Sequence, residues 1–438
     1  MTDETIIALA SAPGSAGVSV VRLSGSKAKL ILKKLIGFIP KPRNASYVDI
    51  NYDGNILDKA IVIYFAAPNS FTGEDVVEIQ CHGSVAVIQQ IIQACLKLGA
   101  SSAGPGEFTK RAFLNDKIDL VQAEAIADLI SSQNQLAAKA AIQNLQGKFS
   151  NKIFEIEKLI TSLRMHIEAS IDFSDEDIEF VELASIKKNV INVTNKLKEV
   201  ISHSNVIGNL QDGIKIVIAG PPNAGKSTLI NYLLEDNVAI VSDIEGTTRD
   251  IVEKNVDFSG LNFILKDTAG IREDTKDIIE KEGIERSKKA LEHADHVLWL
   301  VPYNQVDKYK PPKTEAKVTL VHTKIDEAGP SYNKMCFNDT IEKISAKTGE
   351  GIKTLKDNLV NIYKENLDSN KNFMVRQRHF DSLQKCITQI DSINIDEITL
   401  DLLAEDLKIA HNHLGEITGK ITSDDLLGKI FTSFCIGK

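Results

Sequence analysis

The stretch GIKIVIAGPPNAGKSTLINYLL occupies residues 213–234. It opens with an apolar, β-branched run that is typical of a buried strand, and a helical pattern follows its glycine-rich centre. Gly220 and Gly225 let the backbone curl until several N–H groups converge on phosphate oxygens, and the next helix start adds donors and a positive dipole end. Lys226 would reach the β- and γ-phosphates of a nucleotide, and the Ser227 hydroxyl would bind Mg²⁺. The stretch therefore predicts a P-loop between a strand and a helix.

Two further loops follow in the order that a nucleotide switch requires. The first is the polar segment Gly246–Asp250, GTTRD, with a threonine that can close on Mg²⁺. Strand-like runs at Ile251–Phe258 and Leu261–Lys266 then lead into the sequence DTAG. Asp267, at a strand end, would hold Mg²⁺ through a water molecule, and the Gly270 N–H would contact the γ-phosphate. A DxxG sequence is common by chance, but its place after this strand and after a P-loop favours a phosphate sensor.

The segment that follows a third apolar strand indicates guanine recognition. The run Val318–Val321 precedes HTKID, in which the Asp326 carboxylate can accept two hydrogen bonds from the guanine N1–H and exocyclic amine. Adenine offers no such pair, so a buried polar site of this kind rejects it by roughly 10⁴-fold. The Lys324 stem would cover one face of the base. Ser345-Ala346-Lys347 would offer a backbone N–H to the guanine carbonyl.

Two positions depart from the usual GTPase pattern. Most GTPases have asparagine where Thr323 stands, although Rho-type GTPases are similar to this chain in carrying threonine there. We therefore expect guanine selectivity to survive the change. Ras-like GTPases place a glutamine, which orients the attacking water, where this chain has Ile271. An isoleucine cannot do this, so another group must orient the water.

Composition bounds the class of protein. The chain has 438 residues, of which 43% are hydrophobic and 25% charged, with a net charge of -9. It is long enough for two or three domains, no apolar run approaches the roughly 20 residues of a membrane span, and the acidic N-terminus is unlike a secretory signal. The charge shows no overall nucleic-acid footprint, although a local basic patch is compatible with it. We expect a cytoplasmic protein with reduced, scattered cysteines and no metal-binding cysteine spacing. The cysteines are Cys81, Cys95, Cys336, Cys386 and Cys435.

The first quarter of the chain is predicted to be rich in β-strands. Its short apolar runs are separated by turn sequences such as Pro13-Gly14 and Pro68–Gly73, and one helix is predicted over Val85–Leu98. The predicted strands are Ile6–Ala10, Val18–Arg22, Ala60–Phe65 and Val76–Gln80.

Two helical blocks surround the strand–helix alternation of residues 212–365. The first predicts helices over Glu124–Leu145, Phe149–Ile171 and Ile186–Ile201. Helical patterning returns from 366 to 428, where Leu400, Leu403, Leu407 and Ala410 share one face. We therefore predict a multidomain α/β plus α chain: a β-rich domain (1–118), a helical bundle domain in two parts (119–211 and 366–438), and a Ras-like P-loop domain (212–365) inserted between them.

The motifs together are similar to a known family. GPPNAGKS at 220–227, GTTRD at 246–250, DTAGIR at 267–272 and GIER at 283–286 resemble the bacterial tRNA-modification GTPase family MnmE, also called TrmE. So do FTGED at 71–75, GPGEF at 104–108, AFLNDK at 112–117, AEAI at 123–126 and the terminal FCIGK at 434–438. This resemblance covers essentially the whole chain, and the terminal motif is far more specific than any P-loop.

The resemblance implies a GTPase that K⁺ activates when two G domains dimerise. It places Asn223 at a K⁺-ligand position, with Ser242, Ile244 and Thr247 supplying the rest, and it aligns Ser227 and Thr248 with the Mg²⁺ ligands. A cation between the phosphates can replace the charge of an arginine finger. The alternative role for Asn223 is to shape the P-loop through its side chain. The GTP contacts carried over are Asn223, Ala224, Gly225, Lys226, Ser227, Thr228, Ser242, Asp243, Ile244, Glu245, Gly246, Thr247, Thr248, Asp267, Thr268, Ala269, Gly270, Thr323, Lys324, Asp326, Ser345, Ala346 and Lys347.

The resemblance also implies a water-orienting acid three residues before the GIER motif. Counting back from Gly283 gives Glu280, which would act together with Lys226. The loop after Gly270 is one residue longer than in the best-known members, so Glu282 is the alternative. A role as solvated charges at a helix start is open for both.

The N-terminal domain of the family binds 5-formyl-tetrahydrofolate or a related folate and forms the homodimer. Arg22, Glu78, Lys117 and the terminal Lys438 match its folate-contacting positions. A basic residue would pair with the folate glutamate tail, and a carboxylate would bind the donor face of the pterin. Cys435 is a candidate functional thiol, with a merely buried thiol as the alternative.

The family acts with a partner, MnmG, which uses FAD and NADH, in a heterotetramer. The pair adds an aminomethyl or carboxymethylaminomethyl group to carbon 5 of the wobble uridine of certain tRNAs, with a one-carbon unit from folate. The chain has no Gly-x-Gly-x-x-Gly dinucleotide fingerprint, so FAD is expected on the partner. Which tRNAs are modified, and whether glycine or ammonium is the amino donor, stays open.

Two other functions remain as alternatives. Ribosome-assembly GTPases of the Era or EngA type have similar Gly-Thr-Thr-Arg loops, but they carry an RNA-binding domain after the G domain or two G domains in tandem. This chain has one P-loop domain after a β-rich domain. A non-catalytic GTP switch that scaffolds partners is the second alternative, and the intact Lys226, Ser227, Asp267 and Glu280 argue against it.

Overall fold

The computed structural model describes residues 4–132, 134–172, 183–206, 213–235, 253–267, 294–314, 316–328, 341–364, 373–394, 398–421, 424–432, 434 and 436–437. The chain forms two compact units. Unit 1 consists of Met1–Ala127, Gln143–Lys198 and Ser382–Lys438, and unit 2 of Asp128–Ile142 and Glu199–Asp381. In the described part of the chain, no helix is long and apolar enough to span a bilayer.

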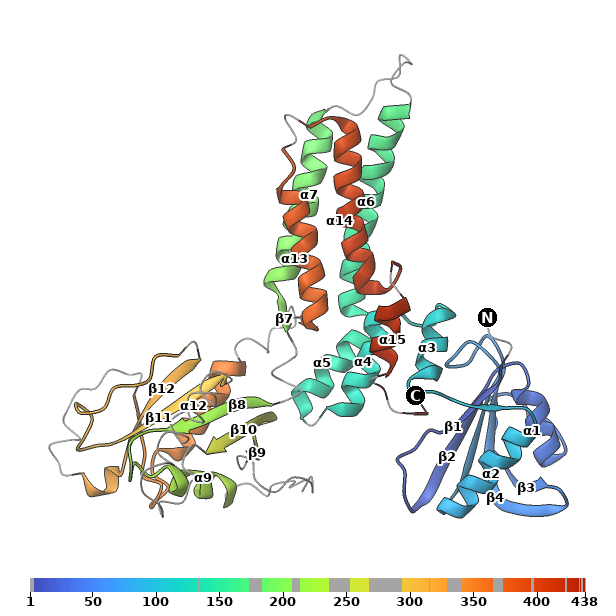
Figure 1. Cartoon of the computed structure of the whole chain (residues 1–438), viewed down its shortest axis with the longest axis horizontal. Helices are drawn as coiled ribbons and strands as arrows, with labels where there is room; N and C mark the ends of the chain where they lie inside the picture. The colour runs from blue at the N-terminus through green and yellow to red at the C-terminus, as the bar shows by residue number, and fades with distance from the viewer. Residues whose placement is uncertain are drawn as a thin grey trace, which may run out of the picture. The chain divides into compact units, whose positions relative to one another are not determined.

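Unit 1 begins with a six-stranded sheet in the order β3-β4-β5-β2-β1-β6. All neighbours are antiparallel except β1 and β6. Helices α1 and α2 lie along one face of this sheet (Figure 1) and share a core with it. The bounds are β1 Ile6–Leu9, β2 Ala16–Ser24, α1 Ala28–Ile36, β3 Ser46–Tyr52, β4 Asn55–Phe65, β5 Val76–Gly83, α2 Val85–Lys97 and β6 Ser101–Ser102.

Alternation along β2 determines which residues this sheet presents outward. Val21 and Leu23 are buried in the core beneath the helices, whereas Val20 and Arg22 are half-buried on the other face. The predicted strands and the helix at residues 85–98 are confirmed. Strand β3 and helix α1 are additional elements that the turn-based sequence pattern did not indicate.

The helices of unit 1 include a bundle formed from α6, α7, α13 and α14, which run side by side in Figure 1. Ion pairs and hydrogen bonds join neighbours, such as Lys198 with Asp391 and Arg164 with His411. Leu403, Leu407 and Ala410 of α14 are buried, as their shared face predicted. The bounds are α3 Glu107–Leu114, α4 Leu120–Ser131, α5 Gln135–Leu145, α6 Lys148–Asp172, α7 Leu183–Ser202, α13 Gln377–Asp391, α14 Leu400–Thr418 and α15 Asp424–Thr432. The end of α4, most of α5, the end of α7 and the start of α13 belong to unit 2.

The prediction of one helix over residues 124–145 is wrong, because the chain forms α4 and α5 there. The hydroxyls of Ser131 and Ser132 donate to the carbonyls of Asp128 and Leu129 at the end of α4. The Asn134 side-chain oxygen then accepts the Ala137 N–H at 2.8 Å and caps α5. Short polar side chains that bond to local backbone thus end one helix and begin the next.

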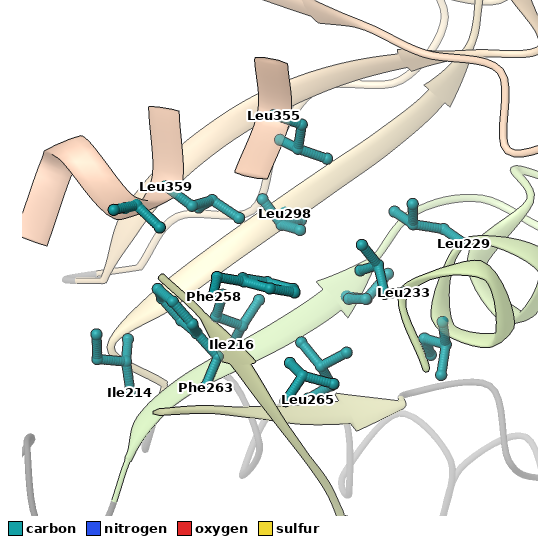
Figure 2. Close-up of a cluster of buried hydrophobic side chains, with 14 of the residues drawn as sticks. Ile214, Ile216, Leu229, Leu233, Phe258, Phe263, Leu265, Leu298, Leu355 and Leu359 are labelled. Carbon is teal, nitrogen blue, oxygen red and sulfur yellow. The ribbon is translucent and has the colours of Figure 1, made fainter. Parts of the chain in front are cut away.

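Unit 2 contains a six-stranded sheet in the order β13-β12-β11-β8-β10-β9, parallel except for the β9–β10 pair. Successive residues of β8 alternate between two buried clusters: Ile216 and Ile218 belong to the larger one (Figure 2), and Val217 and Ala219 to the other. A strand that is apolar on both sides is expected at the centre of such a sheet. The bounds are β8 Ile214–Ala219, α9 Lys226–Glu235, β9 Glu253–Phe258, β10 Leu261–Asp267, β11 His296–Pro302, β12 Lys317–Thr323, η1 Ile325–Glu327, β13 Ile341–Lys343 and α12 Ile352–Lys364.

A short two-stranded ribbon brackets the α/β domain along the chain. Strand β7, Ser204–Val206, precedes β8, and strand β14, Phe373–Val375, follows α12; the two pair in parallel. The predicted helical patterning from residue 366 is therefore wrong at β14. Three residues that are held by a distant partner carry no helical or strand periodicity of their own.

Candidate functional site

The P-loop follows the carboxyl end of β8 and is shaped by three residues with positive φ. Gly220 has φ +153°, and a Cβ built there would lie 2.1 Å from the Leu300 carbonyl oxygen of β11, so only glycine fits. Asn223 has φ 60° and Gly225 has φ +88°. A Cβ at Gly225 would meet no atom within 4 Å. The loop thus turns its backbone toward open space, as phosphate binding requires.

The lysine and hydroxyl groups of the motif lie at the start of α9. Lys226 Nζ donates to the carbonyls of Gly220 at 2.9 Å and Pro221 at 3.1 Å, so the amino group is folded back over the loop. Ser227 and Thr228 are exposed in the first turn of the helix. An exposed hydroxyl beside a nest of backbone N–H groups and a lysine fits a nucleotide with Mg²⁺ on its phosphates.

The carboxyl ends of β12 and β13 carry the two base-recognition segments. Because β8, β10, β12 and β13 are parallel, their loops open at the same edge of the sheet. Asp267 ends β10, opposite Ile218 of β8 in the ladder. Lys324 adopts φ 60°, and the exposed Asp326 lies in the following 3₁₀ turn. These positions agree with the predicted arrangement of phosphate and base loops.

Hydrogen bonds fix the base loops to one another. The Ile325 N–H donates to the Ile344 carbonyl at 3.4 Å, and the Ile344 N–H donates to the His322 carbonyl at 2.9 Å. Ser345 is buried, and its Oγ accepts the Thr348 N–H at 3.2 Å. Ala346 packs against the larger core cluster, and Lys347 is exposed. The Ser345–Lys347 segment is therefore held beside the HTKID loop.

Thr323, the residue that replaces the usual asparagine, connects the base loop to the P-loop. Its side chain is 4% exposed, and its Oγ1 donates to the Ala224 carbonyl at 2.8 Å. Sequence analysis identified Thr323 as a departure but did not predict this contact. Burial and the nearby Lys343 lower the pKa of His322, so the neighbouring imidazole is neutral at pH 7.

A second group of predicted residues gathers on the outward face of the N-terminal sheet. Arg22 on β2 and Glu78 on β5 are register partners, and the Arg22 Nε and NH2 donate to Glu78 Oε1 at 3.0 and 2.8 Å. The rings of Phe71 and Phe108 lie 5.8 and 5.7 Å from the Arg22 guanidinium carbon. Both phenylalanines belong to quoted motifs, FTGED and GPGEF, yet sequence reasoning did not select them because their approach to Arg22 depends on the tertiary fold.

Lys117 belongs to the same neighbourhood through the loop that carries Phe71. A Cβ on Gly73 would lie 3.2 Å from Lys117 Cε, so the lysine stem packs directly on this loop. Asn115 Nδ2 also donates to the Thr72 carbonyl at 2.7 Å. The structure therefore brings Arg22, Glu78 and Lys117 to one loop.

The C-terminal motif packs against the GPGEF motif. Pro105 forms an isolated antiparallel bridge with Ile436, and a Cβ on Gly106 would lie 3.0 Å from Phe434 Cβ. A Cβ on Gly437 would lie 2.0 Å from the Leu9 carbonyl oxygen at the end of β1. Both glycines thus allow close backbone approach, which explains why the two motifs depend on them.

Several predicted site residues lie outside the described residues, so their roles stay predictions. They are Ser242, Asp243, Ile244, Glu245, Gly246, Thr247, Thr248, Thr268, Ala269, Gly270, Glu280, Glu282, Cys435 and Lys438. Among the described residues, no three acidic, histidine or cysteine side chains cluster as a metal site.

A P-loop at the carboxyl end of a central parallel strand, with a TKxD base loop fixed to it, defines the chain as a P-loop GTPase. Two family models match it: the GTP-binding protein TrmE N-terminus over residues 5–117 and the MnmE helical domain over residues 120–435. The chain belongs to the MnmE family of tRNA modification GTPases.

Curated relatives align along the whole chain. The tRNA modification GTPase MnmE of Coxiella burnetii (strain RSA 493 / Nine Mile phase I) is 43% identical and covers 99% of both chains. That of Saccharophagus degradans is 43% identical over 100% of this chain and 99% of its own. That of Shewanella frigidimarina is 42% identical over 100% of both chains.

Proposed function

We propose that the chain hydrolyses GTP and, with the FAD- and NADH-using partner MnmG, installs an aminomethyl or carboxymethylaminomethyl group on carbon 5 of the wobble uridine of certain tRNAs. The observation that carries this proposal is full-length similarity to tRNA modification GTPases together with a P-loop that Thr323 ties to the base loop. The proposal includes a homodimer, a heterotetramer with MnmG, and a location in the cytoplasm, where tRNA is modified.

The GTPase step uses groups at the carboxyl edge of the parallel sheet. Water attacks the γ-phosphorus, the bond to the β-phosphate oxygen breaks, and GDP and phosphate leave. Lys226, now folded onto the Gly220 and Pro221 carbonyls, would turn to the β- and γ-phosphates. Ser227 and Thr248 would hold Mg²⁺, which neutralises phosphate charge when bound. Asp326 would accept the guanine N1–H and amine, and Glu280 or Glu282 would orient the water.

Potassium dependence forms a separate part of the proposal. Asn223 is exposed at the tip of the P-loop with φ 60°, a backbone conformation in which asparagine is enriched. This supports the loop-shaping role and leaves the side chain at the surface, where a ligand from a second G domain can approach. Asn223, Ser242, Ile244 and Thr247 would then hold K⁺ near the transferring phosphate.

The outward face of the N-terminal sheet supports a folate site. The Arg22–Glu78 pair places donors and acceptors side by side near the partly exposed Phe71 ring, a combination that suits a pterin. Lys117, and Lys438 from the chain end, would pair with the glutamate tail. The homodimer of the proposal would form through this domain, as the family resemblance implies.

The domain boundaries complete the proposal. We assign residues 1–118 to the dimerising and folate-binding domain, 119–211 and 366–438 to the helical domain, and 212–365 to the inserted G domain. The β7–β14 ribbon supports an insertion, because it holds the two flanking segments together.

Steady-state GTP hydrolysis by the purified chain in KCl and in NaCl at equal ionic strength tests the GTPase part. We expect K⁺ to raise the rate at least tenfold and Lys226→Ala to abolish it. Equal rates in both salts would remove the K⁺ assignment and favour an assembly-type GTPase or a scaffolding switch.

The tRNA part is tested separately with unmodified tRNA, MnmG, reduced folate and GTP. Mass spectrometry of digested nucleosides should show the new group on uridine only when both proteins are present. Unmodified uridine in the complete mixture, with GTP hydrolysis intact, would refute the tRNA assignment for this chain.

A further inference from the structure

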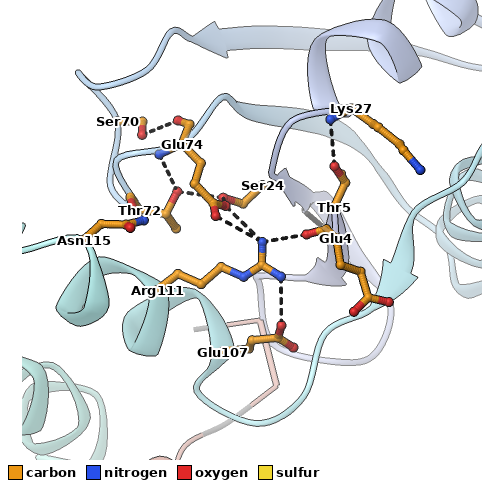
Figure 3. A network of polar contacts seen from close by, with 10 residues as sticks. All are labelled: Glu4, Thr5, Ser24, Lys27, Ser70, Thr72, Glu74, Glu107, Arg111 and Asn115. Atoms are coloured by element: carbon orange, nitrogen blue, oxygen red, sulfur yellow. Dashed lines mark hydrogen bonds and ion pairs between the residues drawn. The ribbon is translucent and has the colours of Figure 1, made fainter. Parts of the chain in front are cut away.

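Arg111 on α3 is a buried cation that connects two distant segments of the N-terminal domain (Figure 3). Its side chain is 8% exposed. NH1 donates to the Glu4 carbonyl at 2.8 Å and to Glu74 Oε2 at 3.0 Å, and NH2 donates to Glu107 Oε1 at 3.1 Å. A guanidinium suits this position because it presents several donors in a fixed plane.

The Glu74 side of the network fixes the loop that carries Phe71. Glu74 Oε2 also accepts the Ser24 hydroxyl at 2.7 Å, and Ser24 Oγ lies 2.6 Å from Thr72 Oγ1. The Ser70 hydroxyl donates to the Glu74 carbonyl at 2.5 Å. Ser70, Thr72 and Glu74 are thus bonded to one another or to Ser24 and Arg111.

The Glu107 side fixes the segment that carries Phe108. Glu107 Oε2 accepts the Gly104 N–H at 2.7 Å, while Oε1 accepts from Arg111. This closes the GPGEF turn at the start of α3. Phe108, the next residue, is fully buried beneath Arg22.

We propose that Arg111 is a positioning residue for the N-terminal ligand site: by holding Glu74 and Glu107 together it sets the spacing of Phe71 and Phe108 around Arg22. Its side-chain hydrogen bonds go to Glu4, Glu74 and Glu107 rather than to the Arg22–Glu78 pair, so it acts through the two loops. This inference rests on the proposed folate function of the site. The ligand class is a reduced folate, the class that the proposed function gives to this site.

Charge makes the position sensitive to substitution. Glu74 and Glu107 have side chains 24% and 28% exposed, and Arg111 is the cation that holds both. Without it, two partly buried carboxylates would repel across the gap and the two loops would separate. Lysine keeps the charge but lacks the fork that holds two carboxylates and a carbonyl at once.

The test measures the dissociation constant of 5-formyl-tetrahydrofolate by calorimetry for the full-length chain. We expect Arg111→Gln to raise it at least tenfold and Arg111→Lys to recover part of that loss. Arg164→Gln is the matched control, because Arg164 of α6 also forms an ion pair, with Glu168, but away from this site; it should leave the constant unchanged. Arg22→Ala should remove binding.

A double-mutant cycle separates positioning from general destabilisation. If Arg111 acts through Phe71, the double variant should have a dissociation constant less than threefold above that of Phe71→Ala alone. If the two residues act independently, the fold-changes of the two single variants would multiply. Should Arg111→Gln fail to fold by circular dichroism, the cycle uses Arg111→Lys, which keeps the charge and loses the fork; a dissociation constant equal to that of wild type would then overturn the positioning role.

The outcomes are distinguishable. A wild-type chain that binds no folate overturns the proposed function of the site. A wild-type chain that binds, with Arg111→Gln binding equally well or with fully multiplicative effects in the cycle, overturns the positioning role alone.

Discussion

The hydrogen bond from Thr323 to the Ala224 carbonyl leads to a sharp prediction for nucleotide affinity. Thr323→Val keeps the size and branching of the side chain and removes only the hydroxyl. The bond is 2.8 Å long and joins two residues that are 4% and 1% exposed, so no bulk water replaces the lost donor readily. The variant therefore removes the hydrogen bond between the two loops without opening a cavity.

The magnitude follows from the position of the bond. A buried hydrogen bond contributes about 1 kcal/mol, and leaving a buried partner unsatisfied costs about 1–3 kcal/mol. GDP would contact both loops at once, so their fixed spacing reduces the cost of ordering them on binding. We expect about 1.4 kcal/mol of this loss to appear in binding, which is a tenfold rise in the GDP dissociation constant.

Equilibrium fluorescence titration with N-methylanthraniloyl-GDP measures the effect. Thr319→Val is the matched control, because Thr319 lies on the same strand and its hydroxyl is 2.8 Å from His296 Nε2, away from the P-loop. It should lower stability without changing GDP affinity. Thr323→Ser keeps a hydroxyl and should bind GDP within about threefold of wild type. Equal GDP affinity for Thr323→Val and wild type would refute the coupling of the two loops.

Three further predictions concern the same unit. Gly220→Ala should weaken GDP binding by about 10²-fold, because its Cβ would lie 2.1 Å from the Leu300 carbonyl oxygen. Gly54→Ala is the control: Gly54 has φ +77° and no atom within 4 Å of a Cβ, so its thermal melt measures the loss of stability from a positive φ without a clash. Asp326→Asn should weaken GTP binding by about 10²-fold and improve XTP binding, since an amide can donate to the xanthine oxygen; competition titrations with the two nucleotides decide this, and an unchanged GTP-to-XTP ratio would contradict it. Burial, with the charge of Lys317, lowers the pKa of His296 to about 4, whereas histidine in the unfolded chain has a pKa near 6.5. As the pH falls below about 6.5, the unfolded chain therefore binds a proton at this residue before the folded chain does, and protonation favours unfolding. Stability should therefore fall by roughly 2–3 kcal/mol from pH 7.5 to pH 4.5, and His296→Gln should lose that part of the dependence in urea unfolding followed by the single tryptophan, Trp299.

The elements predicted correctly are those in which local sequence and tertiary packing favour the same conformation. Strand β8 is apolar because it is buried on both faces, and the P-loop glycines are required by local backbone geometry and by Leu300. The helix over residues 124–145 failed for the opposite reason. Its composition favours a helix throughout, but the Ser132 hydroxyl donates to the Leu129 carbonyl at the end of one helix, and the Asn134 side-chain oxygen accepts the Ala137 N–H at the start of another.

The candidate sites were predictable as residue types and not as contacts. The expected roles of Lys226 as a donor and Asp326 as an acceptor follow from the chemistry of their motifs and stay predictions. The contact of Thr323 with Ala224, or of Arg22 with Phe108, depends on which strands become neighbours, and no local pattern encodes that. The buried position of Arg111 was not predicted either, because an arginine in a helix is usually exposed.

The ribbon of β7 and β14 shows what such long-range pairing does for two segments that are far apart in the sequence. Its strands are three residues long and bond to each other, so the two segments cannot separate without breaking the ladder from Ser204–Phe373 to Val206–Val375. Arg376, the next residue, donates to the nearly buried Asp128 of α4, and Met374 lies in the same cluster as Ala140. Bending the ribbon must therefore strain a partly buried ion pair, worth about 1–3 kcal/mol after discounting for the solvent near Arg376. Two segments without such a ladder and ion pair would meet no such resistance.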